Sequence, residues 1–354
     1  MIDFYKGKRV LVTGHTGFKG SWLCRLLTQA GAQVTGFALA PPTSPSLFEA
    51  AALGATIHDI RGDIRDSEAL AAAFNTARPE IVIHMAAQPI VRDGYQRPAY
   101  TYETNVMGTV NVLECVRQSS TVTSVIIVTT DKVYLNREQD AAYREDDVLD
   151  GYDPYSNSKS CADLATHCYV RSFFTDREGR VTLPVSTVRS GNVIGGGDFA
   201  PDRIIPDCVR AVASHQDIIV RHPHSTRPYQ HVLEPLYAYL LVAERQQQDH
   251  RLAGSYNVGP DDGDCLQTGR LVSLFTERWG DGARWVSRPD DGPHEANLLR
   301  LDSTRLKTAL GWQPRWNIAQ AMDKVVEWSR CWIERGDVRA CMDRQIDEFL
   351  NLQQ

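Results

Sequence analysis

A tyrosine and a lysine four residues apart, Tyr155 and Lys159, form a pair that could transfer a proton. Side chains at this spacing lie on one face of a helix, one turn from each other. A phenol ordinarily has a pKa near ~10, and a neighbouring ammonium group lowers it, so that tyrosinate can exist at working pH. A Tyr-x-x-x-Lys pattern by itself occurs by chance in many proteins of this size. Its meaning therefore depends on what else the chain carries.

A glycine-rich turn near the N-terminus supplies that context. Gly14, Gly17 and Gly20 stand three residues apart, after the apolar run 9–12 and before the helical pattern of residues 21–27. Glycines at a strand-to-helix junction allow a tight turn and let a pyrophosphate approach the helix N-terminus, where free N–H groups and the helix dipole favour an anion. The spacing differs from the commoner G-x-G-x-x-G, and some glycine-rich turns bind no nucleotide. Together with the Tyr–Lys pair, this turn predicts a reductase-like site with a dinucleotide.

The elements that must position these residues follow an alternating pattern. Short β-like runs alternate with amphipathic segments, which is typical of a parallel sheet with helices on both faces. We predict strands at 9–13, 33–38, 57–60, 81–84, 124–128 and 185–188, and helices at 18–29, 67–77, 99–118, 155–173, 204–213, 234–246 and 318–335. The predicted fold is α/β: a Rossmann-type doubly wound parallel sheet with a smaller C-terminal α/β substrate lobe. Ligands of such sheets bind at the C-terminal ends of the strands.

Composition narrows the class of protein. The chain has 354 residues and a net charge of −6, which argues against a nucleic-acid-binding surface. No apolar run approaches the roughly 20 residues of a membrane-spanning helix, and residues 1–6 lack the apolar core of a signal peptide. The eight cysteines form no C-x-x-C motif, so we expect reduced, mostly buried thiols, no disulfides and no metal site. We expect a cytoplasmic protein that binds neither membrane nor nucleic acid.

With these motifs the chain resembles the extended short-chain dehydrogenase/reductase family, which implies NAD as the cofactor. The division implied is an NAD-binding domain at 1–188 and a mainly substrate-binding lobe at 189–354, some of whose segments return to the first domain. The implied cofactor-binding residues are Gly14, Thr16, Gly17, Phe18, Gly20, Asp63, Ile64, Ala86, Ala87, Asn105, Tyr155 and Lys159.

Two of these cofactor assignments leave alternatives open. Asp63 and the amide of Ile64 would contact adenine, but Asp63 could instead be a helix N-cap or turn residue. The second predicted strand ends in residues 37–40, which offer no acid for the ribose 2′-hydroxyl and no arginine for a 2′-phosphate. The choice of NAD over NADP therefore rests on the resemblance.

A hydroxyl, an acid and a base stand together at the end of the fifth predicted strand, as Thr130, Asp131 and Lys132. In the family, the hydroxyl here binds the reacting sugar oxygen beside the tyrosine. An epimerase or simple dehydrogenase needs only Thr130, Tyr155 and Lys159, whereas an adjacent acid and base would let the site also eliminate water. The triplet resembles that of sugar-nucleotide 4,6-dehydratases, and its lysine form resembles the CDP-glucose 4,6-dehydratases. The alternative is a surface salt bridge between Asp131 and Lys132.

The resemblance to the CDP-glucose 4,6-dehydratases runs nearly end to end. It is carried by residues 14–22, 40–48, 151–155, 189–198 and 227–236. It implies a set of substrate ligands, among which arginines suit a diphosphate because their planar donor fork binds two oxygens at once: Gln88, Asn192, Arg203, Arg227 and His294. The chain departs from the family pattern at Val133, Leu135, 139–142 and 149–150, which leaves the accepted sugar and nucleotide open.

The reaction implied is that of a hydro-lyase in deoxysugar and polysaccharide biosynthesis, which converts an NDP-hexose, CDP-glucose first among them, to a 4-keto-6-deoxy sugar. Tyr155 would take the C4 hydroxyl proton, Lys132 the C5 proton, and Asp131 would protonate the departing C6 hydroxyl, while NAD is reduced and reoxidised within each turnover. Two alternatives stand: a 4-epimerase or dehydrogenase on the same fold, and a non-catalytic NAD-binding sensor or scaffold. The expected partners are the nucleotide sugar and a second copy of the chain, in a homodimer through the helices at 99–118 and 155–173 or in a tetramer.

Overall fold

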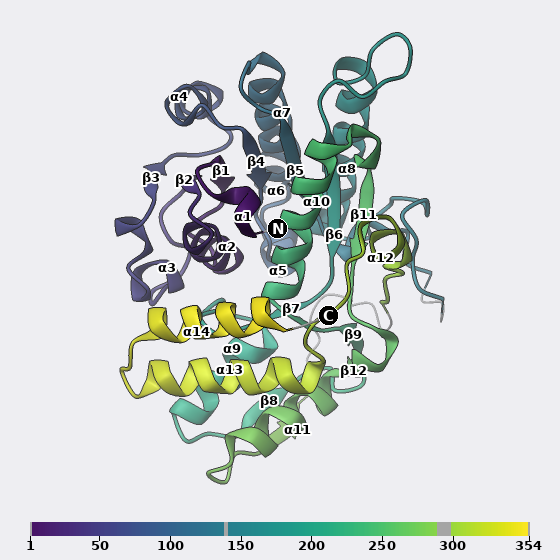
Figure 1. Ribbon diagram of the computed structural model, residues 1–354. Coiled ribbons are helices and arrows are strands. Elements are labelled where there is room, and N and C mark those ends of the chain that lie inside the picture. Colours follow the sequence, from purple (N-terminus) through teal and green to yellow (C-terminus); the bar gives the residue numbers. More distant parts are fainter. Residues whose placement is uncertain (1, 138–140, 289–298, 353–354) are drawn as a thin grey trace.

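The computed structural model describes residues 2–137, 141–288 and 299–352 (Figure 1). In these residues a sheet of seven parallel strands forms the centre of the molecule, in the order β11-β6-β5-β4-β1-β2-β3. Its strands are β1 (Arg9–Thr13), β2 (Gln33–Ala38), β3 (His58–Arg61), β4 (Ile81–His84), β5 (Ser124–Val128), β6 (Val185–Ser190) and β11 (Ser255–Val258). This order reverses direction between β1 and β4, which places a ligand crevice at their C-terminal ends.

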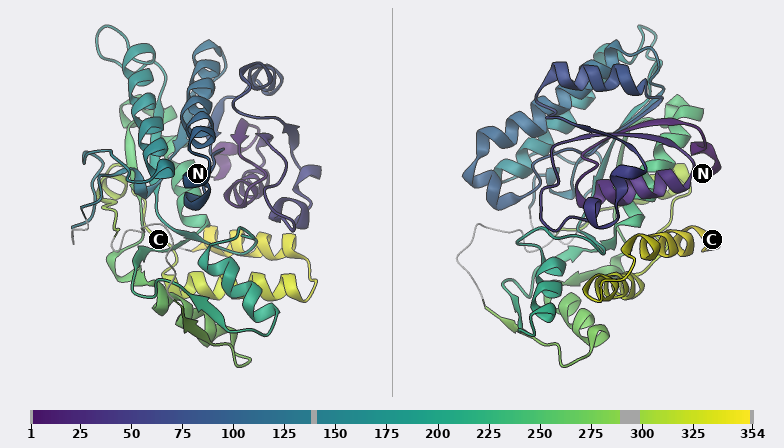
Figure 2. Two further views of the ribbon diagram at one scale, coloured as in Figure 1. Left: turned by 180° about the vertical axis from the view of Figure 1, so that it is seen from behind. Right: turned by 90° about the vertical axis from the view of Figure 1, so that its left-hand side faces the viewer.

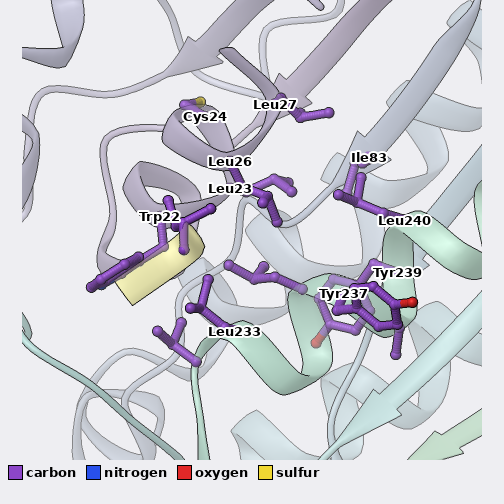
Figure 3. Packing of buried hydrophobic residues seen from close by; sticks show 14 of the residues in the cluster. Trp22, Leu23, Cys24, Leu26, Leu27, Ile83, Leu233, Tyr237, Tyr239 and Leu240 are labelled. Atoms are coloured by element: carbon purple, nitrogen blue, oxygen red, sulfur yellow. The ribbon is translucent and has the colours of Figure 1, made fainter. Parts of the chain in front are cut away.

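Helices cover both faces of the sheet. Apolar side chains alternate along β1, so that Val10 and Val12 point to one face and Leu11 to the other. The first face packs against α2 (Phe18–Gln29) and α10 (Leu233–Gln248), whose side chains interlock in Figure 3. The other face packs against α4 (Ser67–Ala77), α7 (Gly108–Gln118) and α8 (Pro154–Phe173). Burial on both faces explains why these strands read as continuous apolar runs.

A smaller lobe lies beyond the C-terminal ends of the strands, as Figure 2 shows. It contains α9 (Ile204–Ala213), α11 (Thr268–Trp279), α13 (Ile318–Ile333) and α14 (Val338–Asn351). Its short strands pair as β7 (Val193–Ile194) with β10 (Gln230–His231), β8 (Ile218–Val220) with β13 (Trp285–Ser287), and β9 (Thr226–Pro228) with β12 (Cys265–Gln267). The lobe has its own apolar core, built by α9, α11, α13 and strand β8.

Short helices complete the connections. The α-helical ones are α1 (Ile2–Tyr5), α3 (Leu47–Ala50), α5 (Val91–Gln96), α6 (Pro98–Tyr102) and α12 (Thr304–Leu310). A π-helical segment, η2 (Glu103–Met107), joins α6 to α7. The 3₁₀ turns are η1 (Leu53–Ala55), η3 (Asp131–Val133), η4 (His250–Leu252) and η5 (Asp262–Asp264).

The predicted α/β fold is confirmed, with differences in detail. The six predicted strands are present, β3 one residue later than predicted, and β11 is a seventh strand that the sequence analysis did not identify. The helix predicted at 99–118 is instead three consecutive helical segments, α6, η2 and α7. The proposed domain boundary at residue 188 falls inside β6, and both α10 and β11 belong to the sheet layer, so the sheet draws on both halves of the sequence.

Two expectations about composition can be compared with the structure. Of the eight cysteines, Cys24, Cys208 and Cys341 are buried, four are half-buried and Cys168 is exposed, so the expectation of mostly buried thiols is wrong. No helix in the described ranges has both the length and the apolarity to cross a bilayer.

Candidate active site at the C-terminal edge of the sheet

The glycine-rich turn joins β1 to α2, and its three glycines have different roles. Gly14 has a φ of +79°, and a Cβ there would lie 2.7 Å from the backbone nitrogen of Ala86, because the turn presses against the end of β4. A Cβ on Gly20 would lie 2.1 Å from the Gly14 carbonyl oxygen, so this glycine lets α2 pack on the turn. A Cβ on Gly17 would lie 3.5 Å from its nearest neighbour, the Gly14 carbonyl oxygen, and no described side chain caps the helix that follows. Gly17 therefore leaves the helix N-terminus open, as a dinucleotide pyrophosphate requires.

Thr16 and Phe18 fix the turn between its neighbours. The buried Thr16 hydroxyl donates to the Leu39 carbonyl oxygen at 3.0 Å and so ties the turn to the end of β2. The half-buried Phe18 ring contacts Gly195 of the second lobe, where a Cβ would lie 3.0 Å from Phe18 Cζ. These residues fit the outline of a dinucleotide site.

Small residues follow β4 at the predicted nicotinamide side. Ala86 and Ala87 are half-buried, and the Ala86 amide donates to the Thr13 hydroxyl at 3.2 Å. The same hydroxyl lies 2.7 Å from Nδ1 of the buried His84, so β1 and β4 are joined directly beside the turn.

Asn105 and Gln88 are buried and bond to each other. The Asn105 side chain accepts from the Gln88 amide at 2.8 Å and donates to the Ser158 hydroxyl at 2.9 Å, which links the β4 loop to α8. The Gln88 side chain donates to Thr101 at 2.9 Å and accepts from the Ile90 amide at 2.6 Å. The structure therefore shows Gln88 bonded within the protein, and its substrate contact stays a prediction.

Asp63 and Ile64 follow β3. The Asp63 carboxylate accepts from Nη2 of Arg65 at 2.7 Å and from the Arg65 amide at 2.9 Å, and these bonds lower the pKa of Asp63. Ile64 is buried against Gly108, where a Cβ would lie 2.5 Å from Ile64 Cδ1. Asp63 thus acts as a turn residue in this structure, and its contact with adenine stays a prediction.

Thr130, Asp131 and Lys132 lie just beyond β5, where η3 begins. The Thr130 hydroxyl donates to Asp131 Oδ1 at 2.9 Å, and both side chains are buried. Asp131 Oδ2 is buried and finds no hydrogen-bond partner among the described residues. Burial raises the pKa of Asp131, although Lys132, Thr130 and Arg227 act in the opposite direction. Lys132 is half-buried, but Asp131 is buried and does not lie on the surface. The alternative of a surface salt bridge between the two residues is therefore wrong.

Tyr155 and Lys159 lie on the first turns of α8. Asp153 caps the helix by accepting from the amides of Tyr155 and Ser156 at 3.0 and 3.1 Å, which holds the first turn of α8, where Tyr155 lies. Burial raises the pKa of Tyr155 to about 12, against a hydrogen bond with Thr130 that lowers it. Lys159 is buried, donates to the Val128 carbonyl oxygen at 3.1 Å, and has its pKa lowered by burial to about 8. The predicted lowering of the Tyr155 pKa is therefore wrong for this structure, in which desolvation of the phenol dominates.

Of the predicted substrate ligands, Arg203 and Arg227 reach this group. Arg203 lies just before α9, pairs with Asp198 at 3.1 Å, and its charge lowers the pKa of Tyr155. Arg227 is buried in β9, and its charge lowers the pKa of Asp131. Asn192 lies between β6 and β7, and its carbonyl oxygen accepts from the Gln230 amide at 3.0 Å. His294 lies outside the described residues.

Lys19 is a site-lining residue that the sequence analysis did not identify. Its ammonium group donates to the Ser190 hydroxyl at 3.2 Å and to the Tyr239 hydroxyl at 2.7 Å, which lie at the end of β6 and on α10. Burial and the nearby charges of Lys159 and Arg203 lower the pKa of Lys19 to about 7. The position of Lys19 inside the glycine-rich turn could have marked it as a candidate, but its hydrogen-bond partners are far away in the sequence.

Comparisons with known proteins give one family match and several relatives. Over residues 11–325 the chain matches the family model described as GDP-mannose 4,6 dehydratase. It is 46% identical to a CDP-glucose 4,6-dehydratase of Salmonella typhimurium over 358 residues, covering 99% of both chains. It is 28% identical to a dTDP-D-glucose 4,6-dehydratase of Bos taurus over 332 residues, covering 91% of this chain and 89% of the relative.

Solved structures of low sequence identity share the fold. A UDP-glucose 4-epimerase of Thermotoga maritima with UDP-glucose has a TM-score of 0.79 at 22% identity, covering 92% of this chain and 99% of the other. A dTDP-glucose 4,6-dehydratase of Bacillus anthracis in complex with NAD has a TM-score of 0.76 at 21% identity, covering 93% and 99%. Since an epimerase and a dehydratase share this fold, the fold alone does not select the reaction.

Proposed function

Because the chain belongs to the family described as GDP-mannose 4,6 dehydratase, we propose that it is an NDP-glucose 4,6-dehydratase, a hydro-lyase, whose substrate is CDP-glucose. The resemblance read from the sequence is confirmed by this membership. The 46% identity over nearly the whole of both chains supports CDP-glucose above other nucleotide sugars.

One observation of the structure carries the reaction type: a buried acid lies beside the proton-transfer residues. Asp131 bonds to Thr130, Thr130 interacts with Tyr155, and the second carboxyl oxygen of Asp131 has no partner among the described residues. Because burial raises the pKa of Asp131, the protonated carboxylic acid is favoured more than it would be in water. A dehydratase needs such a proton donor because the C6 hydroxyl leaves as water, whereas an epimerase expels no hydroxyl and needs none.

NAD is the proposed cofactor, and the turn around Gly17 is open to its pyrophosphate. Bound there, NAD would accept hydride from the sugar C4 and give it back at C6. Thr16 and Phe18 would shape the site around the turn, Ala86 and Ala87 would admit the nicotinamide, and Lys159 would reach the nicotinamide ribose.

The residues of the chain then handle three protons. Tyr155 takes the C4 hydroxyl proton, with Thr130 holding the same sugar oxygen. The resulting 4-keto group acidifies C5–H, and Lys132 removes that proton. Asp131 protonates the departing C6 hydroxyl, so that water leaves and a 4-keto sugar with a C5=C6 double bond remains. Lys132 then returns its proton to C5 as hydride is restored at C6, which gives the 4-keto-6-deoxy sugar.

Two arginines suit the diphosphate of the substrate. The charge of Arg203 lowers the pKa of Tyr155, and the charge of Arg227 lowers the pKa of Asp131, so both arginines lie near the catalytic residues. A diphosphate bound by the two arginines would therefore hold the sugar against these residues. Asn192 and Gln88 are proposed as further contacts, and His294 as a contact near the nucleoside.

The direct test incubates purified protein and NAD with CDP-, dTDP-, GDP- and UDP-glucose, and follows the alkali-developed absorbance of a 4-keto product. The expected result is a 4-keto-6-deoxy product from CDP-glucose without net release of reduced cofactor. An isomer with an intact 6-hydroxyl would establish a 4-epimerase, accumulation of free NADH a dehydrogenase, and absence of any product a sensor or scaffold. A product from another nucleotide sugar alone would overturn the choice of CDP-glucose.

A further inference from the structure

The end of β2 lacks the acid that ordinarily recognises the adenosine ribose of NAD. In Rossmann folds an acidic residue about 20 positions beyond the glycines accepts a hydrogen bond from the ribose 2′-hydroxyl. Here the strand ends at Ala38. The neighbouring strand β3 runs parallel, with Arg61 opposite Ala38 and Asp59 opposite Gly36.

The side chains of Asp59 and Arg61 come together at this place. Arg61 Nη2 donates to Asp59 Oδ2 at 2.7 Å, and Arg61 Nη1 donates to the Leu39 carbonyl oxygen at 3.2 Å. The same carbonyl oxygen accepts from Thr16 of the glycine-rich turn at 3.0 Å. The guanidinium of Arg61 therefore lies directly beside the turn that would hold the pyrophosphate.

His15 fixes the acid from the other side. Its buried ring lies 2.7 Å from Asp59 Oδ1 through Nε2. The ring fits only because position 36 is glycine, where a Cβ would lie 2.3 Å from the His15 ring. Asp59 is thus held between His15 and Arg61 and cannot turn freely toward or away from a ligand.

The charges of this group are balanced. Although desolvation opposes it, hydrogen bonds from Arg61 and His15 lower the pKa of Asp59, while burial lowers the pKa of His15. The result is one carboxylate matched by one guanidinium, beside a neutral imidazole. Arg61 keeps 40% of its side chain exposed, so its outer N–H groups can reach a further acceptor.

We propose that Asp59 and Arg61 of β3 replace the missing β2 acid in recognising the adenosine ribose, and that the site accepts NADP as well as NAD. This inference rests on the proposed function, since it concerns the cofactor of that reaction. An unopposed carboxylate at the ribose would repel a 2′-phosphate, but here the carboxylate is neutralised by an arginine whose donor fork suits phosphate oxygens. Selection between the two dinucleotides also brings no advantage when hydride returns to the substrate within each turnover, because the redox state of the cellular pool then has no influence on the reaction.

Binding rather than activity tests the proposal. Isothermal titration calorimetry of the full chain with NADP and NAD, and with the fragments adenosine 2′,5′-bisphosphate and 5′-AMP, measures the contribution of the 2′-phosphate. NADP should bind within about tenfold of NAD. Arg61→Ala should weaken NADP by about tenfold or more, the scale of a lost charged hydrogen bond, and change NAD less than about threefold.

Two further variants separate this contact from general damage. Arg180→Ala is the matched control, because Arg180 also pairs with an aspartate, Asp176, at 2.8 Å. This pair lies in the loop before β6, at the N-terminal ends of the strands and away from the glycine-rich turn. It should change neither affinity. Ala38→Asp restores an acid at the end of β2 and should weaken NADP by about tenfold or more while NAD is retained.

The outcomes are distinct. If NAD binds but NADP binds more than about tenfold more weakly, or if Arg61→Ala weakens both dinucleotides equally, the inference is overturned and the proposed function stands. If neither dinucleotide binds, the proposed function falls together with it.

Discussion

At the scale of single residues, Tyr155 carries the proposed first proton transfer. Tyr155→Phe removes only the hydroxyl, so the nucleotide sugar should still bind while kcat falls about 10²–10⁴-fold, the usual loss when a general base is removed. Steady-state rates and calorimetric binding of CDP-glucose check the two parts. Tyr169→Phe is the matched control, because Tyr169 lies on the same helix but bonds to Glu114 at 2.8 Å, far from the strand ends. More than a tenth of the wild-type kcat in Tyr155→Phe would show that the phenol is not the base.

Asp131 and Lys132 separate elimination from simple oxidation. Asp131→Asn keeps the size of the side chain but cannot give a proton, and Lys132→Met keeps the stem but removes the base. In either variant, absorbance near ~340 nm from reduced nicotinamide should build up on mixing with substrate, and product should form at least about 10²-fold more slowly. Stopped-flow absorbance and product analysis measure both effects. Dehydration at nearly the wild-type rate in both variants would assign them a structural role and favour the epimerase alternative.

Lys19 predicts a dependence of stability on pH. Its pKa is lowered to about 7 from an ordinary 10.5, so between these values the unfolded chain binds more protons than the folded one. Stability contributed by this group is therefore lowest below pH 7 and rises with pH up to about 10.5. Lys19→Met removes the titrating group, so the stability of this variant relative to the wild type should fall by about 2 kcal/mol from pH 7 to pH 9. Urea unfolding at both pH values measures this change, and a constant difference between the two proteins would contradict it.

How far the sequence reveals the site depends on how local each interaction is. The tight turn through Gly14 and the packing of Gly20 on it involve residues close together in the sequence, so the turn was predictable, whereas the contact of Gly14 with Ala86 was not. The bonds of Lys19 to Ser190 and Tyr239 join residues that lie 171 and 220 positions apart, and no local pattern announces them. The Tyr155 pKa depends on how deeply the fold buries the phenol, so its direction could not be deduced from the Tyr–Lys spacing.

At the scale of elements, long and strongly patterned segments were predicted well. Helix α2 and strands β1, β2, β4 and β5 have the predicted bounds. The π-helical segment η2, which carries the buried Asn105, was missed because a single turn of five residues is too short to establish a different apolar period. The paired strands of the second lobe contain two or three residues each, too few for a repeating pattern.

The helices on one face of the sheet predict the oligomer. Leu164 and Phe173 of α8 and Met107 of η2 are each about half exposed, which is unusual for large apolar side chains on a covered face. We predict a two-fold dimer in which α8 and the helical stretch at 99–118, made of α6, η2 and α7, meet their copies. Light scattering at micromolar concentration should give the mass of a dimer, and Leu164→Asp should shift it toward a monomer. A monomeric mass for the wild type would contradict the prediction.

At the scale of the whole molecule, α13 and α14 join the second lobe to α2, the helix that follows the glycine-rich turn. Arg25 of α2 pairs with Asp343 of α14 through two bonds, at 2.5 and 2.7 Å. On α13, Trp328 is buried directly against Gly196, where a Cβ would lie 2.0 Å from its ring. Through these contacts, α2, which follows the glycine-rich turn, and the segment 195–199 both pack against the helix pair α13 and α14.

The contact between Gly196 and Trp328 leads to a prediction about stability. Gly196→Ala forces a methyl group into a filled space, and overpacking of this kind costs about 1–3 kcal/mol of unfolding free energy. Gly254→Ala is the control, because no atom lies within 4 Å of a Cβ there. Urea unfolding of both variants measures the difference, and equal stabilities would show that Trp328 moves aside freely.

The position of α10 and β11 also bears on how the protein is made. Residues 9–190 supply six of the seven strands, but α10, which covers much of one apolar face, ends only at Gln248. While the ribosome is still adding the intervening segment, Ile126 and Val128 of β5 lack the helix α10 that packs against this strand. A nascent chain of this protein therefore offers an apolar surface to chaperones before it can close its sheet.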